Sequence, residues 1–196
     1  IKGLEKDIDK KLWQKRKVFA LLSREINDLH GKTLGIIGKG SIGMKVGRIA
    51  KAFGMNINYF SVRNYKKTQF LKFLSSLDYL SIHCPLNEKT KDLITIKELK
   101  IMKKNMILIN TARGGIVNEN DLTKALKQKI IAGAGIDVTT SEPPKKSHPY
   151  YSILNEANFI WTPHTAWASN ETLQEAINQL IKNINSFYKG KKINIV

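Results

Sequence analysis

The stretch Thr33–Gly54, TLGIIGKGSIGMKVGRIAKAFG, joins a short apolar run to a cluster of glycines and then to a helical pattern. Three of its glycines, Gly38, Gly40 and Gly43, have the spacing G-x-G-x-x-G. A lone match to this spacing is weak, but here it follows a predicted strand and opens a predicted helix, which is the context that dinucleotide binding requires. The first glycine would allow a tight turn, the second would let a pyrophosphate approach the backbone, and the third would let the helix pack closely on the strand. The stretch therefore favours a dinucleotide site over a turn without a ligand.

The predicted helix also supplies a place for the phosphates. The first N–H groups of a helix, here including those of Ser41 and Ile42, have no acceptor within the helix. They lie at the positive end of the helix dipole, which attracts anions. We therefore expect the phosphates to bind to the backbone at Ser41 and Ile42.

The end of the next predicted strand leaves the choice between NAD and NADP open. A unit that selects NAD usually carries an acidic residue about 20 residues beyond the glycines, where it holds the ribose 2′-hydroxyl. Here no acidic residue occurs between Met55 and Lys72. Ser61 occupies the expected place, and Arg63 and two lysines follow it. A serine among cations suits a 2′-phosphate, but Ser61 could equally bond to a plain ribose hydroxyl.

Short apolar runs alternate with helical patterns along the rest of the chain. The runs are TLGII (33–37), NINYF (56–60), YLSIH (79–83), MILIN (106–110), IAGAGIDV (131–138) and NFIWT (158–162). The helical candidates between them lie at about 42–53, 68–76, 95–102 and 118–129. This order is typical of βαβ units, and near-continuous apolar runs suit strands that are buried on both faces. The sequence therefore predicts an α/β fold, a Rossmann-like doubly wound parallel sheet with helices on both faces.

Three parts are expected along the chain. Residues 1–30 are predicted to be a helical lead-in, because apolar residues recur three or four positions apart. Residues 31–168 are predicted to form the dinucleotide-binding domain. Residues 169–196 would be a C-terminal helix, over about Asn170–Tyr188, followed by a tail, and one face of this helix is apolar.

Composition argues against several classes of protein. Of the 196 residues, 42% are hydrophobic and 25% are charged, which is ordinary for a globular domain. No apolar run reaches about 18 residues, so no membrane span is expected. The single cysteine, Cys84, cannot form an internal disulfide and suits a reducing, cytoplasmic compartment. The formal net charge is +17, but the lysines are scattered, so we expect a solvated surface and weak steering of anions, with no nucleic-acid partner.

Three polar residues follow three different predicted strands. Arg113 comes after MILIN, Glu142 comes after IAGAGIDV, and His164 comes after NFIWT. Asp137 lies at the end of the second of these runs. The carboxyl ends of parallel strands meet at one edge of a sheet, where ligands bind. We therefore expect these side chains to gather beside the glycine loop.

Together these residues suit hydride transfer to a carbonyl. Such a reaction needs a proton donor for the oxygen, and histidine exchanges protons near neutral pH. A neighbouring carboxylate would keep the imidazole of His164 protonated and oriented, and Arg113 could clamp a substrate carboxylate through two hydrogen bonds. Taken singly, each of these residues also has a structural interpretation as a solvated charge or a packed histidine. We interpret His83 and His148 in that structural way.

Five motifs in series resemble those of the D-isomer-specific 2-hydroxyacid dehydrogenases. They are GKTLGIIGKGSIG, SIHCPLNEKTKDLI, MILINTARGGIVNENDL, AGIDVTTSEPP and TPHTAWAS. The resemblance runs from about Leu29 to the end of the chain, and it is greatest to the glycerate dehydrogenase (hydroxypyruvate reductase) branch. It implies that Arg113 clamps the substrate, that Glu142 is the partner of the histidine, and that His164 is the acid/base.

The same resemblance implies the cofactor, NAD(H) or NADP(H), and its contacts. Asp137 matches the aspartate that contacts the nicotinamide amide. The other positions that match cofactor contacts are Gly38, Gly40, Ser41, Ile42, Gly43, Ser61, Pro85, Thr90, Thr111, Ala112, Arg113, His164, Ala166 and Trp167. The substrate would be a small 2-keto or 2-hydroxy acid, the chain would form a homodimer, and no metal is expected.

One departure from the family concerns the substrate-binding half. Family members carry a sizeable N-terminal substrate-binding portion, and this portion is expected to be absent here because residue 1 already lies close to the cofactor domain. The apolar stripe of the C-terminal helix, which packs on that portion in the family, would need another cover. A second hypothesis is therefore a truncated or split-gene cofactor-binding module without turnover, as in corepressors of the same fold. Formate dehydrogenase is disfavoured, because those enzymes have a glutamine where Glu142 stands.

Overall fold

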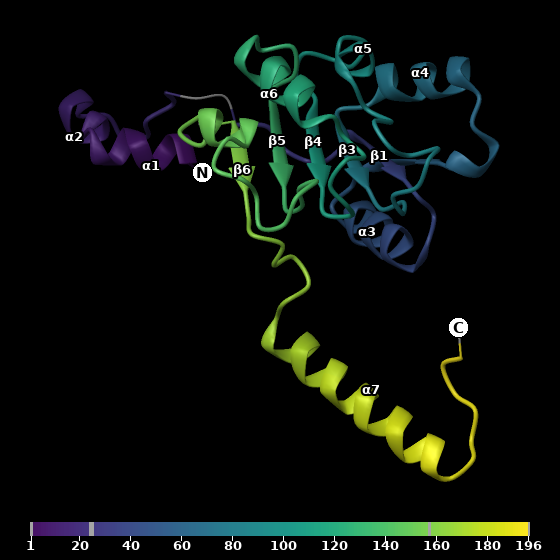
Figure 1. Cartoon of the computed structure of the whole chain (residues 1–196). Coiled ribbons are helices and arrows are strands. Elements are labelled where there is room, and N and C mark those ends of the chain that lie inside the picture. Colours follow the sequence, from purple (N-terminus) through teal and green to yellow (C-terminus); the bar gives the residue numbers. More distant parts are fainter. Residues whose placement is uncertain (1, 24–25, 157, 196) are drawn as a thin grey trace. The chain divides into compact units, whose positions relative to one another are not determined.

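The computed structural model describes residues 2–23, 26–156 and 158–195. By its internal contacts the chain divides into two compact units, Ile1–Trp161 and Thr162–Val196. The first unit contains, in order, α1 (Lys2–Asp9), α2 (Leu12–Arg16), β1 (Thr33–Ile37), α3 (Ser41–Ala52), β2 (Asn56–Phe60), the 3-10 helix η1 (Val62–Asn64), α4 (Lys67–Ser76), β3 (Tyr79–Ile82), α5 (Ile96–Leu99), β4 (Ile107–Asn110), α6 (Glu119–Lys127), β5 (Gly133–Ile136), the 3-10 helix η2 (Pro149–Ile153) and β6 (Phe159–Trp161) (Figure 1). The boundary expected between residues 168 and 169 lies inside the second unit, so the three-part division stays a prediction.

Six parallel strands form one sheet in the order β2-β1-β3-β4-β5-β6. β1 lies between β2 and β3, so that Ile36 pairs with Tyr59 of β2 on one side and with Ser81 of β3 on the other. Each strand lies within one of the six apolar runs, and α3, α4, α5 and α6 lie on the four predicted helical ranges within one or two residues, apart from the shorter α5. The prediction of a doubly wound α/β fold is confirmed.

Neighbouring residues of β1 identify the helices on the two faces of the sheet. Gly35 faces α4, because a Cβ built on Gly35 would lie 2.8 Å from the ring of Phe73. Ile36 faces α3, because its side chain is the close neighbour of Gly43 and Gly47. Successive residues of a strand point to opposite faces. α3 and α4 therefore cover opposite faces, and Figure 1 shows α3 apart from α4, α5 and α6.

Two apolar clusters join these layers. The larger cluster lies between the sheet and α4 to α6, and its fully buried members include Phe70 and Leu74. The smaller cluster joins β1 to α3 and includes Ile36 and Ala50. Burying a large apolar side chain contributes roughly 1.5–3 kcal/mol. The clusters hold the strands and helices of the first unit together, which positions the loops that follow β1 to β5.

The N-terminal lead-in is only partly helical. After α2, Lys17 adopts a left-handed φ of +50°, and no described residue between there and β1 is helical. Residues 24 and 25 of the expected helix lie outside the described residues. Phe19 and Leu22 are 100% and 85% exposed. The prediction of a continuous helix is therefore wrong beyond α2. The left-handed Lys17 ends α2 after five residues, and a helix as short as the remaining stretch is marginal in water without packing.

The second unit is a loop followed by α7 (Asn170–Tyr188). Ser169 caps the helix, because its Oγ accepts a hydrogen bond from the N–H of Thr172 at 3.1 Å. The helix matches the predicted range. None of its described residues is buried, and the apolar stripe is exposed at Ile177 and Leu180, among others.

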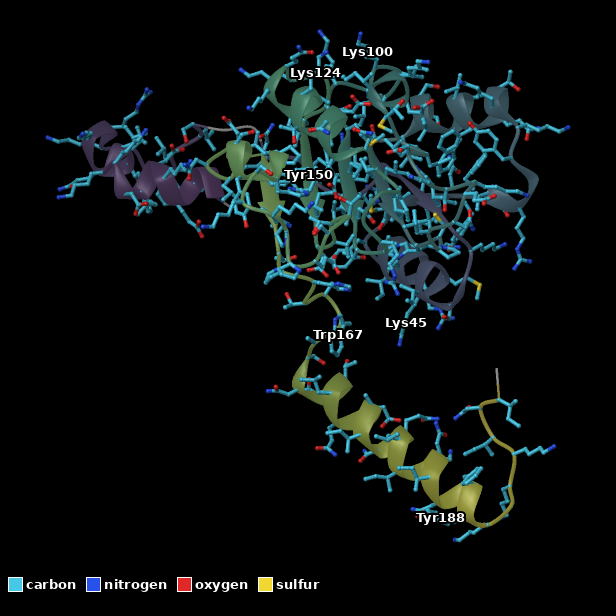
Figure 2. All side chains as sticks on the ribbon, viewed as in Figure 1. Lys45, Lys100, Lys124, Tyr150, Trp167 and Tyr188 are labelled. Atoms are coloured by element: carbon cyan, nitrogen blue, oxygen red, sulfur yellow. The ribbon has the colours of Figure 1, made fainter. Side chains whose placement is uncertain are left out.

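The basic residues are spread over several elements of the first unit. Lys45 on α3, Lys100 after α5 and Lys124 on α6 are all exposed and project outward (Figure 2). This distribution fits the predicted solvated surface. Among the described residues, no helix has both the length and the apolar character that crossing a bilayer requires.

Candidate active site

The strand order places a ligand crevice at the carboxyl ends of β1 and β3. The chain runs from β1 to β2 on one side and then returns to β3 on the other side. The direction of winding reverses between β1 and β3, and ligands of open α/β sheets bind at such a point. The loops after these two strands meet there, because a Cβ built on Gly38 would lie 2.6 Å from the carbonyl oxygen of His83.

The three glycines of the motif, two before α3 and one in its first turn, differ in what a side chain would meet. Gly38 has a φ of +103°, a conformation that residues with a Cβ rarely adopt. A Cβ on Gly43 would overlap the carbonyl oxygen of Gly38, so this glycine lets α3 approach the strand. Gly40 is the N-cap of α3, and no heavy atom lies within 4 Å of its Cβ position. The first turn of α3 is therefore open above Gly40, and its backbone donors fit a pyrophosphate.

A pocket of about 460 Å³ opens at the carboxyl ends of β2 and β3. It is lined by Val62, Arg63, Asn87, Glu88 and Lys89. The exposed Ser61 precedes it, and its Oγ accepts a hydrogen bond from the N–H of Arg63 at 3.4 Å. Because the lining holds two cations and one carboxylate, it has groups for a ribose hydroxyl and for a 2′-phosphate.

Thr90 shapes the loop that follows β3. Its Oγ1 donates to the carbonyl oxygen of Pro85 at 2.7 Å and accepts from the N–H of Asn87 at 2.8 Å. Thr90 is 0% exposed, so its side chain offers no surface to a ligand. In this structure the hydroxyl of Thr90 serves the loop itself, and a cofactor contact at Thr90 stays a prediction. Pro85 in the same loop is exposed.

Burial disfavours charge on two side chains near the crevice. Burial lowers the pKa of His83, whose Nε2 lies 2.8 Å from the Oγ of Ser81. Burial also raises the pKa of the Cys84 thiol to about 11. Near neutral pH both side chains are therefore uncharged, which agrees with the structural interpretation of His83.

Arg113 lies in a tight loop after β4 that Asn110 organises. Asn110 is 2% exposed, and its side chain donates to the carbonyl oxygen of Arg113 at 3.0 Å and accepts from the N–H of Ala112 at 3.1 Å. The exposed guanidinium of Arg113 donates from Nη1 to the carbonyl oxygen of Ala112 at 2.7 Å. A guanidinium has five N–H donors, so others can serve a substrate carboxylate. Thr111 in this loop is exposed, and Ala112 is half-buried.

Asp137 and Glu142 belong to the loop after β5. The N–H of Asp137 donates to the carbonyl oxygen of Asn110 at 3.0 Å, which ties the ends of β4 and β5 together, and Asp137 is 3% exposed. Glu142 is exposed, and its Oε1 accepts a hydrogen bond from the N–H of Thr139 at 2.9 Å. This bond turns the carboxylate back toward the end of β5.

The arginine loop and the glutamate loop lie side by side, as expected for neighbouring strands. β4 and β5 pair directly. Gly114, which follows Arg113, packs against the peptide between Thr139 and Thr140, where a Cβ would overlap the backbone. The structure thus brings the loops of Arg113 and Glu142 to one edge of the sheet.

His164 belongs to the second unit and comes three positions after the last residue of β6. Its N–H donates to the carbonyl oxygen of Thr162 at 3.1 Å, and its φ is +54°. Histidine is one of the few residues besides glycine that are enriched in this left-handed conformation. Ala166 and Trp167 follow in the same loop, and Trp167 is 54% exposed. The meeting of His164 with Arg113 and Glu142 stays a prediction.

Sequence reasoning missed two features of the site. Asn110 had a visible signal, because it is a polar residue that closes the apolar run MILIN. The other feature is a hydrogen-bonded pair of Glu119 and His148, with 2.9 Å between Oε2 and Nε2. These residues are 29 positions apart, and no local pattern links them. His148 itself is buried, in agreement with its structural interpretation.

Residues 1–166 match the family description "D-isomer specific 2-hydroxyacid dehydrogenase, NAD binding domain". The chain belongs to this dehydrogenase family. A glycerate dehydrogenase of Methylorubrum extorquens is 43% identical to this chain over 188 residues, which cover 94% of the chain and 59% of the relative. A hydroxypyruvate reductase of Blautia hydrogenotrophica is 32% identical over 192 residues, with the same coverage of 94% and 59%. The chain thus spans less than two thirds of the length of these relatives.

Solved structures agree with the family and include both nicotinamide cofactors. An NAD-complexed D-isomer specific 2-hydroxyacid dehydrogenase from Lactobacillus delbrueckii ssp. bulgaricus has a TM-score of 0.81 and 29% identity, and the match covers 95% of the present chain and 63% of that chain. An acyclic imino acid reductase in complex with NADPH and D-Arg has a TM-score of 0.79 and 31% identity, with coverage of 97% and 62%. The resemblance inferred from the motifs is confirmed, as is a nicotinamide dinucleotide as the cofactor class of the domain.

Proposed function

We propose that the chain is the cofactor-binding part of an oxidoreductase that interconverts a small D-2-hydroxy acid and its 2-keto acid, such as glycerate and hydroxypyruvate. The observation that carries this proposal is the open first turn of α3 at Gly40, in a domain whose arginine and glutamate loops lie side by side. Similarity to a glycerate dehydrogenase and to a hydroxypyruvate reductase supports the substrate class.

The backbone after β1 would hold the cofactor. The N–H groups of Ser41 and Ile42 would bind the pyrophosphate, and the pocket that contains Arg63 would take the adenosine end. Asp137 and the loop from Thr111 would hold the nicotinamide end. When bound, the nicotinamide supplies or accepts the hydride.

Arg113, Glu142 and His164 would serve the substrate. The guanidinium of Arg113 would bind the substrate carboxylate through parallel hydrogen bonds, and the Asn110 side chain holds the backbone of that loop. His164 would give a proton to the carbonyl oxygen during reduction and take it back during oxidation. The carboxylate of Glu142 would orient the imidazole and favour its charged form.

The exposed face of α7 supports a cover from outside its own unit. We propose that residues 169–196 pack on a substrate-binding half, supplied by further chain or by a second chain. We also propose that the dehydrogenase acts as a homodimer. Closing the crevice with a second half would exclude water from the reacting atoms.

A binding module without turnover is the second candidate. The test is to supply this chain with NADH and hydroxypyruvate or glyoxylate, and to follow the absorbance of NADH. We expect consumption of NADH and formation of the D-hydroxy acid. Tight nucleotide binding with no consumption would favour the module.

The choice between the two cofactors should depend on Arg63. Replacing Arg63 with alanine is expected to weaken NADPH binding about fivefold with little effect on NADH, because an exposed ion pair contributes up to about 1 kcal/mol. Nicotinamide fluorescence during titration with NADH and NADPH measures both affinities. Arg48→Ala on α3 removes the same charge and should leave their ratio unchanged. An equal loss for the two cofactors in Arg63→Ala would contradict a 2′-phosphate contact.

A further inference from the structure

Glu119 forms a polar network under the loop that carries Glu142. Glu119 is the first residue of α6, and its side chain is only 10% exposed. Its Oε1 accepts from the N–H of Thr140 at 2.7 Å, and its Oε2 accepts from the Oγ1 of Thr140 at 2.8 Å. The same Oε2 lies 2.9 Å from the Nε2 of His148. One carboxylate thus holds both the backbone and the side chain of Thr140.

The geometry of His148 makes it the donor to this carboxylate. Its Nδ1 accepts a hydrogen bond from the N–H of Tyr150 at 3.4 Å, which leaves Nε2 to carry the proton that points to Glu119. Its ring stacks on Trp161, the last residue of β6, with centroids 5.4 Å apart and planes 26° apart. The ring also meets the edge of Tyr150, which is fully buried beside β6 and is labelled in Figure 2. The imidazole is therefore locked between α6 and β6.

The peptide between Thr139 and Thr140 transmits this anchoring to the candidate site. On one side Thr140 is bonded to Glu119, and on the other side the peptide packs against Gly114, next to Arg113. The N–H of Thr139 donates to the Oε1 of Glu142 at 2.9 Å. This N–H belongs to the preceding peptide, which is joined to the Thr139–Thr140 peptide through the Cα of Thr139. Tilting the Thr139–Thr140 peptide would therefore also shift the neighbouring donor that orients Glu142.

A buried carboxylate paired with a buried imidazole is a poor way to gain stability alone. Desolvating such groups costs several kcal/mol, and apolar residues of similar volume often do as well or better. A polar network does, however, specify one arrangement of the backbone, because each donor and acceptor must be satisfied. A positioning role accounts for a buried pair at this place.

We propose that Glu119 and His148 are positioning residues that fix the Thr139–Thr140 peptide and thereby aim Glu142 for proton transfer. This inference rests on the proposed function, in which Glu142 orients the imidazole of His164. Neither Glu119 nor His148 touches the substrate in this scheme. They act through the backbone that orients Glu142, the proposed partner of His164.

The test combines amide exchange with steady-state kinetics in the full chain. In Glu119→Gln, the charge-assisted bonds to Thr140 are lost, and we expect the amide of Thr139 to exchange at least about tenfold faster, although its own acceptor is Glu142. We expect kcat for hydroxypyruvate to fall about tenfold, with the KM for NADH unchanged. Unchanged exchange at Thr139 together with faster exchange at Thr140 would reduce Glu119 to a local structural contact and overturn the proposal.

Two milder variants keep the test decisive if Glu119→Gln fails to fold. Thr140 is exposed, so Thr140→Val removes its hydroxyl donor and Thr140→Ser keeps it. We expect the valine variant to show the same changes in smaller measure, and the serine variant to behave like the parent chain. Glu156→Gln, an exposed carboxylate of the same unit, is the charge control and should change nothing. Identical behaviour of the valine and serine variants would overturn the proposal.

Glu142→Gln separates this inference from the proposed function. If Glu142→Gln leaves turnover intact, the role proposed for Glu142 fails, and the positioning role fails with it. If Glu142→Gln removes turnover while Glu119→Gln and Thr140→Val leave kcat and the Thr139 amide unchanged, only the positioning role is overturned. The positioning role is supported if all three variants lower kcat, and if Glu119→Gln and Thr140→Val change amide exchange at Thr140 whereas Glu142→Gln does not.

Discussion

An aspartate at position 40 is expected to weaken NADH binding at least about 100-fold and to leave the chain folded. Two unit charges about 4 Å apart, at an effective dielectric constant near 20, interact by about 4 kcal/mol, and 1.4 kcal/mol is a factor of about ten in affinity. Gly40 is the N-cap of α3, and its Cβ position is open. Aspartate is among the preferred N-cap residues. The new carboxylate should therefore stabilise α3 while it repels the phosphates.

The matched control for Gly40→Asp is Ser169→Asp. Ser169 is the N-cap of α7 in the second unit, so this variant adds the same charge to another helix start. We expect its NADH affinity, measured by nicotinamide fluorescence, to equal that of the parent chain, and we expect both variants to melt within a few degrees of it. Full NADH affinity in Gly40→Asp would contradict phosphate binding at α3. Equal losses in both variants would indicate only a general effect of net charge.

Replacing His164 with asparagine is expected to slow hydride transfer to hydroxypyruvate about 10²–10⁴-fold, the usual range for a lost general acid, with NADH affinity preserved. His164 has a φ of +54°, and asparagine tolerates this conformation. The loop should therefore keep its shape while the proton donor is lost. His164→Ala should have the same effect on turnover, although alanine adopts a left-handed φ less readily.

Single-turnover absorbance measurements follow hydride transfer in His164→Asn, and fluorescence follows NADH binding. His30→Asn, at an exposed histidine before β1, is the control and should retain both. Retained turnover in His164→Asn would refute the acid role. Loss of binding and turnover together would assign His164 a structural role instead.

The centre of the sheet was predictable because strands such as β1 and β3 are buried on both faces. Ile36, for example, meets α3 on one face, while its neighbour Gly35 meets α4 on the other. A strand in this setting needs an apolar or small residue at every position, which leaves a continuous run in the sequence. The glycine loop was predictable for a related reason, because Gly38 and Gly43 stand where a Cβ would overlap backbone.

The N-terminal lead-in shows where such patterns stop being informative. The spacing of its apolar residues suits a helix, but Phe19 and Leu22 are almost wholly exposed and not helical. The spacing of apolar residues indicates which of them would share one face of a helix. It does not indicate whether another part of the protein packs on that face. The same limit applies to α7, which forms over its predicted range although its apolar stripe is exposed.

The candidate site was predictable in its loops and less so in its supports. Arg113 and Glu142 follow strands whose order a βαβ pattern implies, so their loops lie side by side. Some supports depend on contacts between distant residues, as where Glu119 reaches Thr140 and His148. Others depend on burial that no motif shows, as where the buried Thr90 bonds to Pro85 within its own loop. Motif matching places a residue near a ligand, but burial decides whether its side chain can touch that ligand.

The most direct measurement is a titration of the labelled chain with NADH, followed by the backbone amide signals in NMR spectra. Binding at the carboxyl ends of the strands should shift the amides of Gly40, Ser41 and Ile42 most, together with those of Thr111–Arg113, and should leave the exposed lysines of α6 unaffected. Shifts scattered over the basic surface, or an unchanged spectrum at millimolar NADH, would contradict a dinucleotide site at the start of α3.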